Sequence, residues 1–285
     1  MTFNRPEERI ASLAVEAMLH EAAAGPKPGL VDRYNNGAHK DMDLFTFCSS
    51  AAVLHPYFSS MTETGFHFTG SDLLNLLRQI RPIGIEAEKA MFEATSGINT
   101  HKGLIFSLGI LCASAGYLLK NETPGKNITG DDLCGIASQM CRGIVERELA
   151  VSNRKQTHGE KLFQDSGTTG IRGEAEAGFP SVTGSALPAL RRSAGEWNNR
   201  LVDILLLLMT EVEDSNVLHR GGTESLKRVK EQAGEALEAG GSGNLKGREI
   251  LHRMDRDFAE RNISPGGCAD LLAVTIFLYK LENII

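Results

Sequence analysis

Apolar residues recur at the spacing of an α-helix along almost the whole chain, and this period restricts the possible fold more than any other feature. In the segment 7–24 they form one face, and Gly25 and Pro26 then end the helix. The same period predicts further helices at 43–58, 71–80, 85–94, 103–120, 131–148, 198–211, 223–239, 245–261 and 267–282. No segment alternates apolar and polar residues between hairpin turns, so the sequence predicts an all-α fold.

The segment 151–186 is the exception, because it is polar and rich in glycine. Long loops of this kind are usually binding loops or linkers between domains. Its polar residues favour a binding loop, although a linker remains the alternative: Thr168, Thr169, Arg172, Glu174 and Glu176. We therefore predict a single domain over residues 1–285, with about ten helices and a polar, Gly-rich loop region in the middle.

The charge balance narrows the range of partners. The formal net charge is −6, which argues against a protein that coats nucleic acid or an anionic membrane. The first ten residues lack an apolar signal core, and the longest apolar segment, 201–209, is shorter than the roughly 20 residues of a membrane span. Five scattered cysteines without a C-x-x-C pair suggest reduced thiols, so we expect a cytoplasmic protein.

Four polar residues precede the apolar helix expected from residue 103, and they allow two interpretations. Asn99, Thr100, His101 and Lys102 could simply cap the helix. They could also bind an anion, because the free N–H groups and the dipole at a helix N-terminus attract phosphate and Lys102 adds a full charge. This stretch alone favours capping.

Three other segments combine rigid turns with chemically reactive side chains. In 25–43, glycines and prolines fix a turn that carries carboxylates, lysines and histidine, a set that suits Mg²⁺ and phosphate. In 212–222, acidic residues follow an apolar helix against the helix dipole, a conflict that a bound cation would remove. In 263–273, Asp270 follows a Pro-Gly-Gly turn, where a functional role and simple dipole compensation are equally good explanations. Glu86 and Glu88 are equally ambiguous.

Several common catalytic motifs are missing from the sequence. The glycine-rich segment 240–247 lacks the spacing of a phosphate-binding P-loop and is better explained as a turn between helices. There is no G-x-S-x-G elbow and no H-E-x-x-H pair, so serine esterase and zinc protease chemistry have no support.

Five motifs together resemble the triphosphoribosyl-dephospho-CoA synthase family. They are PKPGLVDRYNNGAHKDMD, RPIGIEAEKAMFEATSGINTHKGLIFSLGILCA, GIRGEAEAGFP, EDSNVLHRGG and ISPGGCADLLA. The resemblance extends from about residue 10 to residue 280. Ser215 and Cys268 depart from it, since a Thr and a Ser are usual there, and both changes are small.

The resemblance implies an all-α transferase that joins ATP to 3′-dephospho-CoA, releases adenine and forms 2′-(5″-triphosphoribosyl)-3′-dephospho-CoA. This product is the precursor of the prosthetic group of citrate lyase, and a counterpart serves malonate decarboxylase; the motifs lean modestly toward citrate lyase. A hydrolase of N-glycosidic bonds in nucleotides or ADP-ribose conjugates is the first alternative, and a nucleotide-binding regulator without turnover is the second.

The family's chemistry assigns expected roles to residues of this sequence. Cleavage of an N-glycosidic bond builds positive charge on the ribose, which carboxylates stabilise. We expect Glu174, His39 and Asp32 to be catalytic, with Asp32 also a candidate for the water shell of a metal. Asp41, Asp43 and Asp214 are the expected ligands of Mg²⁺. The expected substrate-binding residues are Lys27, Arg33, Asn99, Thr100, His101, Lys102, Arg172, Asn216 and Arg220. With the resemblance, the anion-binding interpretation of 99–102 becomes the favoured one.

The resemblance also implies partners. ATP and 3′-dephospho-CoA are the expected substrates, with Mg²⁺ as cofactor and no nucleic acid or membrane. The transferase that loads the acyl carrier protein is a candidate downstream partner. The sequence leaves the oligomeric state open.

Overall fold

The computed structural model describes residues 5–121, 127–149, 163 and 167–283. All regular secondary structure in these ranges is helical, with 12 α-helices and one short π-helix and no strand. The all-α prediction is therefore confirmed.

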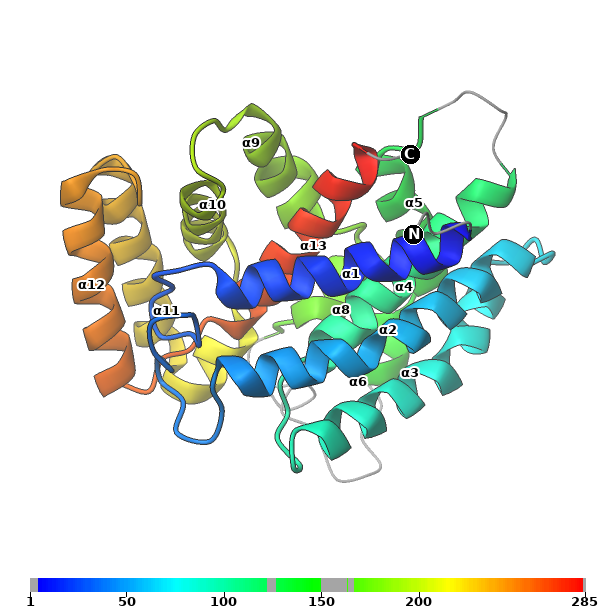
Figure 1. The fold of residues 1–285 in the computed structure, drawn as a ribbon, viewed down its shortest axis with the longest axis horizontal. Coiled ribbons are helices and arrows are strands. Elements are labelled where there is room, and N and C mark those ends of the chain that lie inside the picture. The colour runs from blue at the N-terminus through cyan, green and yellow to red at the C-terminus, as the bar shows by residue number, and fades with distance from the viewer. Residues whose placement is uncertain (1–4, 122–126, 150–162, 164–166, 284–285) are drawn as a thin grey trace.

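The first half of the chain forms a layer of long helices (Figure 1). These are α1 (Pro6–Ala23), α2 (Leu44–His67), α3 (Leu74–Ala94) and α4 (Lys102–Asn121). Helices α2 and α4 approach so closely that a Cβ on Gly65 would lie 2.0 Å from the carbonyl oxygen of Ala113, and one on Gly116 would lie 2.0 Å from that of Thr62. Glycine at these two positions therefore lets the two helix backbones touch.

The middle of the chain consists of short helices: α5 (Gly130–Cys141), α6 (Ile144–Leu149), α8 (Gly170–Glu176), the π-helix η1 (Val182–Ala186) and α9 (Leu187–Arg192). The loop prediction for 151–186 is wrong over α8 and η1, and residues 150–162 and 164–166 lie outside the described residues. The short apolar pieces of this segment, Ala175, Phe179, Val182 and Ala186, are fully buried. Packing therefore stabilises helices too short and glycine-rich to be recognised by their period.

The last four helices are α10 (Trp197–Glu211), α11 (Ser215–Glu238), α12 (Leu245–Glu260) and α13 (Gly266–Glu282). In Figure 1, α11 and α12 stand together at one end, while α13 runs through the middle beside α4. A continuous cluster of buried apolar residues extends from Ile10 in α1 to Leu281 in α13.

Several helix boundaries differ from the prediction, and α2 continues to His67 where the expected helix ended at residue 58. Helix α3 continues through Pro82 where two helices were expected, and the helix expected over 131–148 breaks at Gly143, whose φ is 72°. Helix α11 begins at Ser215 and not at residue 223, with a non-helical Gly222 inside it. Glu213 and Asp214 therefore lie just before the N-terminus of α11 as well as after the C-terminus of α10, and acidic residues are favourable before a helix.

Among the described helices, α4 is the one that is long and apolar enough to cross a membrane by length and composition. Of the 18-residue stretch of α4 that meets these criteria, 67% is buried inside the molecule, and the core helix of a globular protein meets the same criteria.

Candidate active site

The main candidate site is a cleft of about 570 Å³ where the N-termini of three helices meet. Residues 99–103 contribute the start of α4, Ser215 and Asn216 the start of α11, and Gly266 and Gly267 the start of α13. The N-terminus of each helix presents free N–H groups and a positive dipole end. The fold thus directs three positive helix ends toward one cavity, an arrangement that favours an anionic ligand.

The floor of the cleft is acidic. Glu21, near the end of α1, is 4% exposed, and its carboxylate forms an ion pair with the ammonium group of Lys27, which is 1% exposed. The Lys27 ammonium also donates to the carbonyl oxygen of Glu21, at 2.6 Å. Burial raises the pKa of Glu21, and Lys27 opposes that shift. Lys27 therefore neutralises a carboxylate beneath the cleft and does not itself line it.

Asp270 in α13 lies over the first turn of α4. A Cβ on Gly103 would be 2.4 Å from its carboxylate, so glycine makes room for this group. Burial raises the pKa of Asp270 well above its usual value, and the negative charges of Glu21 and Asp214 add to the shift. A carboxyl group with this environment is suited to hold a proton that a reaction could use.

The wall at the start of α4 contains a chain of hydroxyl groups that ends on a histidine. The Thr100 hydroxyl donates to Ser50 Oγ at 2.8 Å, and Ser50 Oγ lies 2.6 Å from Nδ1 of His101. In that order Ser50 donates to Nδ1, which leaves the proton on Nε2 of the ring. Burial, and then the charge of Lys27, lowers the pKa of His101 to about 3, so the ring is neutral at pH 7. Its buried Nε2 has no partner among the described residues.

Both interpretations of the start of α4 find support here. Asn99 Oδ1 accepts a hydrogen bond from the backbone N–H of Lys102 at 3.2 Å, which is capping. Thr100, His101 and Lys102 also line the cleft, where an anion would meet them. The Lys102 ammonium lies 2.9 Å from the carboxylate of Glu88, so its charge is partly balanced.

The rim carries the other predicted residues that reach the cleft. His39 Nε2 lies 2.9 Å from Ser264 Oγ, and its Nδ1 lies 4.0 Å from the carboxylate of Asp41. Burial and the charge of Arg220 lower the pKa of His39, while Asp41 opposes them. Arg220 donates to Asn262 Oδ1 at 2.9 Å.

A second cavity of about 310 Å³ adjoins the cleft and shares Ile171, Ser215 and Gly267 with it. Glu174 lines this second cavity, and its carboxylate accepts a hydrogen bond from the Ser181 hydroxyl at 2.6 Å. Burial raises the pKa of Glu174. The structure therefore places the two residues expected to transfer protons, His39 and Glu174, around adjoining cavities.

Asp214 lines the second cavity, but its carboxylate accepts hydrogen bonds from the backbone of two helix starts. It caps α11 by accepting from the N–H groups of Asn216 at 2.8 Å and Val217 at 3.2 Å, and it accepts from Cys268 at the start of α13 at 2.8 Å. Burial raises its pKa, and these hydrogen bonds oppose the shift. The conflict with the helix dipole that suggested a cation is thus relieved by the helix that follows.

Other expected site residues lie away from the cleft. The Asp32 carboxylate accepts from the N–H groups of Lys27, Tyr34 and Asn35 at 2.7 to 3.0 Å, which fixes the turn before α2. Asp43 caps α2 through a reciprocal pair of bonds with Thr46. The two carboxylates therefore stabilise a turn and a helix start. The expected catalytic role of Asp32 and the expected metal-binding role of Asp43 stay predictions.

Two arginines are also held elsewhere. The Arg33 guanidinium stacks on the Tyr34 ring, 5.0 Å from its centroid, and lies outside the cleft lining. Arg172 binds Glu148 at 2.8 Å beside a third pocket along α4.

In the described part of the chain, no group of three or more His, Cys, Asp or Glu side chains is arranged to hold a metal ion. The three expected ligands are dispersed, with Asp41 at the cleft, Asp43 at the start of α2 and Asp214 beside the second cavity. Oxygen donors for a divalent cation are nevertheless present in the cleft as Glu21, Asp41 and Asp270. They suit an ion that takes most of its ligands from substrate phosphates and water.

Sequence reasoning missed Glu21. A signal was available, because Glu21 lies three residues after Met18 and so falls on the same buried face of α1 as the apolar residues. A carboxylate on an apolar stripe is costly unless it is paired, and such a residue is a candidate for function.

Comparison with known proteins shows to which family the chain belongs. Residues 7–285 match the CitG family, described as ATP:dephospho-CoA triphosphoribosyl transferase. The chain is 45% identical over 277 residues to a protein of Citrobacter koseri named probable 2-(5''-triphosphoribosyl)-3'-dephosphocoenzyme-A synthase, covering 96% of this chain and 91% of that protein. No solved structure matches. The chain belongs to the ATP:dephospho-CoA triphosphoribosyl transferase family.

Proposed function

We propose that the cleft at the three helix N-termini is where this transferase joins the triphosphoribosyl group of ATP to the 2′-hydroxyl of 3′-dephospho-CoA and releases adenine. The observation that carries this proposal is the combination of positive helix ends with an acidic floor. The helix ends suit the phosphate chains, and carboxylates suit the positive charge that develops on the ribose when its bond to adenine breaks.

The proton transfers have suitable groups in the cleft. As the C1′–N9 bond of ATP breaks, its electron pair leaves with adenine, and the protonated carboxyl group of Asp270 supplies the proton that neutralises the leaving base. As the 2′-hydroxyl of dephospho-CoA bonds to C1′, His39 accepts its proton on Nδ1, in the neutral tautomer whose Nε2–H donates to Ser264 Oγ. Glu174, across the shared wall, remains the second candidate for proton transfer.

We further propose that ATP enters with Mg²⁺, which neutralises the triphosphate. The charge of Asp41 would otherwise repel the phosphates, since Glu21 is paired with Lys27 and Asp270 holds a proton. Asp41 is the carboxylate we expect to hold the ion, because it lies on the rim with its side chain 63% exposed.

The activity test measures adenine release from ATP and Mg²⁺ by the purified protein, with and without 3′-dephospho-CoA, while the product is followed by mass. We expect adenine only when dephospho-CoA is present, in equal amount to a triphosphoribosyl adduct. Adenine without an adduct would indicate a hydrolase, and no adenine would overturn the proposal.

The metal assignment predicts different results for two neighbouring aspartates. Asp41→Asn should raise the Mg²⁺ concentration for half-maximal rate by about tenfold, in line with the loss of one charged ligand. Asp43→Asn is the matched control, because asparagine also caps helices and Asp43 does not line the cleft. Equal Mg²⁺ dependence in the two variants and the unaltered protein would show that Asp41 does not hold the metal.

The product is the precursor of the citrate lyase prosthetic group, and we propose that it passes in the cytoplasm to the transferase that loads the acyl carrier protein. The five cysteines are free thiols, four of them buried, which suits a reducing compartment.

A further inference from the structure

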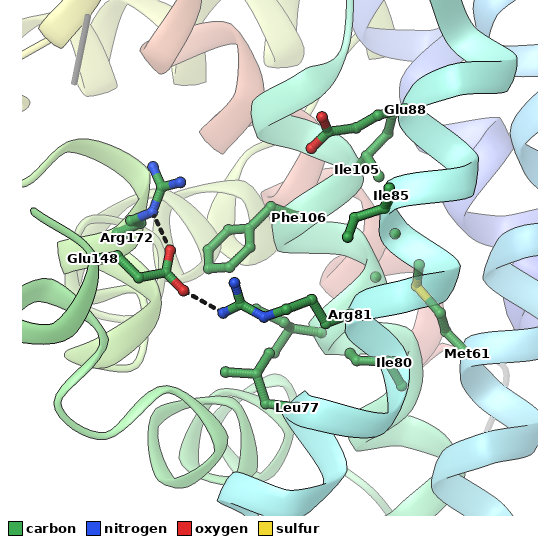
Figure 2. Close-up of a pocket in the computed structure, with 13 residues that line it drawn as sticks. Met61, Leu77, Ile80, Arg81, Ile85, Glu88, Ile105, Phe106, Glu148 and Arg172 are labelled. Carbon is green, nitrogen blue, oxygen red and sulfur yellow. Dashed lines mark hydrogen bonds and ion pairs between the residues drawn. The ribbon is translucent and has the colours of Figure 1, made fainter. Parts of the chain in front are cut away.

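A separate pocket of about 140 Å³ lies between α3 and α4, one to two helical turns beyond the cleft. Figure 2 shows its lining, which is mainly aliphatic. The walls include Met61, Leu77, Ile80, Ile105 and Ile110. Ile85 also lines the pocket, and half of this apolar side chain is exposed to solvent (50%).

The polar groups of this pocket are charged and mutually paired. In Figure 2, Arg81 and Arg172 both point toward Glu148, which forms an ion pair with each of them. The Arg172 guanidinium lies over the ring of Phe106, 5.9 Å from its centroid. The pocket thus offers aliphatic walls and paired hydrogen-bonding groups. Phe106 is the aromatic residue of its lining, and the Arg172 guanidinium lies over that ring.

The pocket and the cleft are neighbours along α4. Lys102 lines the cleft, and its ion-pair partner Glu88 lines the pocket. Ile105 and Phe106 of the pocket follow Gly103 of the cleft within one turn, a rise of about 5 Å. An extended ligand that fills the cleft can therefore continue into the pocket.

We propose that this pocket binds the pantetheine arm of 3′-dephospho-CoA, an inference that rests on the proposed function. ATP and dephospho-CoA both carry adenosine and a phosphate chain, and the arm, with its branched dimethyl group and short alkyl chain, is the aliphatic part that distinguishes them. A purine ring stacks best on an aromatic face, and the Phe106 ring of this pocket already carries the Arg172 guanidinium. The two amides of the arm can instead reach Glu88 and the group of Arg81, Glu148 and Arg172.

The test compares two ligands that differ only by the arm. ADP has the adenosine and diphosphate of dephospho-CoA without pantetheine. Titration calorimetry of each ligand would be measured for the unaltered protein and two variants. Gly84→Val narrows the pocket, since a Cβ there already lies 3.7 Å from Met61 Cε, and Ile85→Ala removes an exposed apolar contact.

We expect each variant to weaken binding of dephospho-CoA by about tenfold, the effect of a changed methylene contact in an apolar pocket, and to leave ADP binding within about twofold. Gly135→Val is the matched control for the first variant, because Gly135 is a helical glycine with nothing within 4 Å of its Cβ position. Leu245→Ala, an apolar residue of α12 that is 68% exposed, is the control for the second.

Equal weakening of both ligands, or of neither, would overturn the assignment. So would a protein that binds dephospho-CoA no more tightly than ADP. Product formation is measured on the unaltered protein, so these outcomes are independent of the proposed function. If the protein forms product and the variants bind both ligands normally, only the pocket assignment is refuted. If the ligands bind as expected but no product forms, only the proposed reaction is refuted.

Discussion

At the scale of single residues, the ring of His101 is held in one orientation by its neighbours. Ser50 and Thr100 form the hydroxyl chain that reaches Nδ1, and Phe47 packs edge-on against the ring at 5.0 Å between centroids. The neutral ring can then offer its Nε2–H to a phosphate or ribose oxygen in the cleft, a donor that does not depend on pH near neutrality.

Ser50→Ala should therefore impair catalysis. The change removes the donor to Nδ1 and leaves this buried nitrogen of His101 unpaired, at a cost of about 1–3 kcal/mol. We expect kcat to fall by about tenfold, the order of effect of losing a hydrogen bond that orients a functional group. We also expect the ring to lose its Nε2–H preference, measured by ¹⁵N NMR of the imidazole. Ser49→Ala, at the exposed neighbouring residue, is the control. If both variants keep the tautomer and the rate, the hydroxyl chain has no positioning role.

The site residues show what local sequence can indicate. Residues 99–102 were recognisable because polar groups at the mouth of an apolar helix are visible in the sequence, and the structure brings them to the cleft with His39 and Arg220. Asp32 and Asp43 carry the same chemical groups, but their oxygens are used by nearby N–H groups. Whether a carboxylate faces its own turn or a distant cavity depends on the path of the chain, which residue type and spacing do not fix.

At the scale of elements, the close contact of α2 with α4 positions the wall of the cleft. Gly116→Ala should lower the free energy of unfolding by about 1–3 kcal/mol, because its Cβ would lie 2.0 Å from the carbonyl oxygen of Thr62 and the helices must separate. Chemical denaturation measures this change.

Gly135→Ala in α5 is the matched control, since nothing lies within 4 Å of its Cβ position. There the same substitution should raise the free energy of unfolding by about 0.5–1 kcal/mol, because alanine favours a helix interior over glycine. A Gly116→Ala protein as stable as this control would show that α2 and α4 can separate without cost.

At the scale of the whole molecule, burial of neutral His101 couples stability to pH. An unfolded His is protonated below about pH 6.5, whereas the folded ring resists protonation down to a pKa of about 3. Its contribution to stability is therefore complete above pH 6.5 and is lost as the pH falls toward 3.

His101→Gln should make the acid side of the stability curve shallower by about 1.4 kcal/mol per pH unit, the effect of one proton. Urea unfolding at several pH values between 6.5 and 4 measures this slope. His252→Gln on the exposed surface of α12 is the control. An unchanged slope in His101→Gln would mean that the folded ring takes up its proton in the ordinary range.

The sequence by itself determined the helical class and most helix positions, because a period of 3.6 apolar residues and Gly or Pro stop signals are local properties. It also indicated the family, since the motifs are long and ordered. Only the tertiary structure decided that α8 and η1 are helical, because their glycine-rich segments gain stability from packing. It likewise decided that the starts of α4, α11 and α13 meet at one cleft that Glu21 and Asp270 also line. These groups come from separate parts of the sequence and come together only when the helices pack on one core.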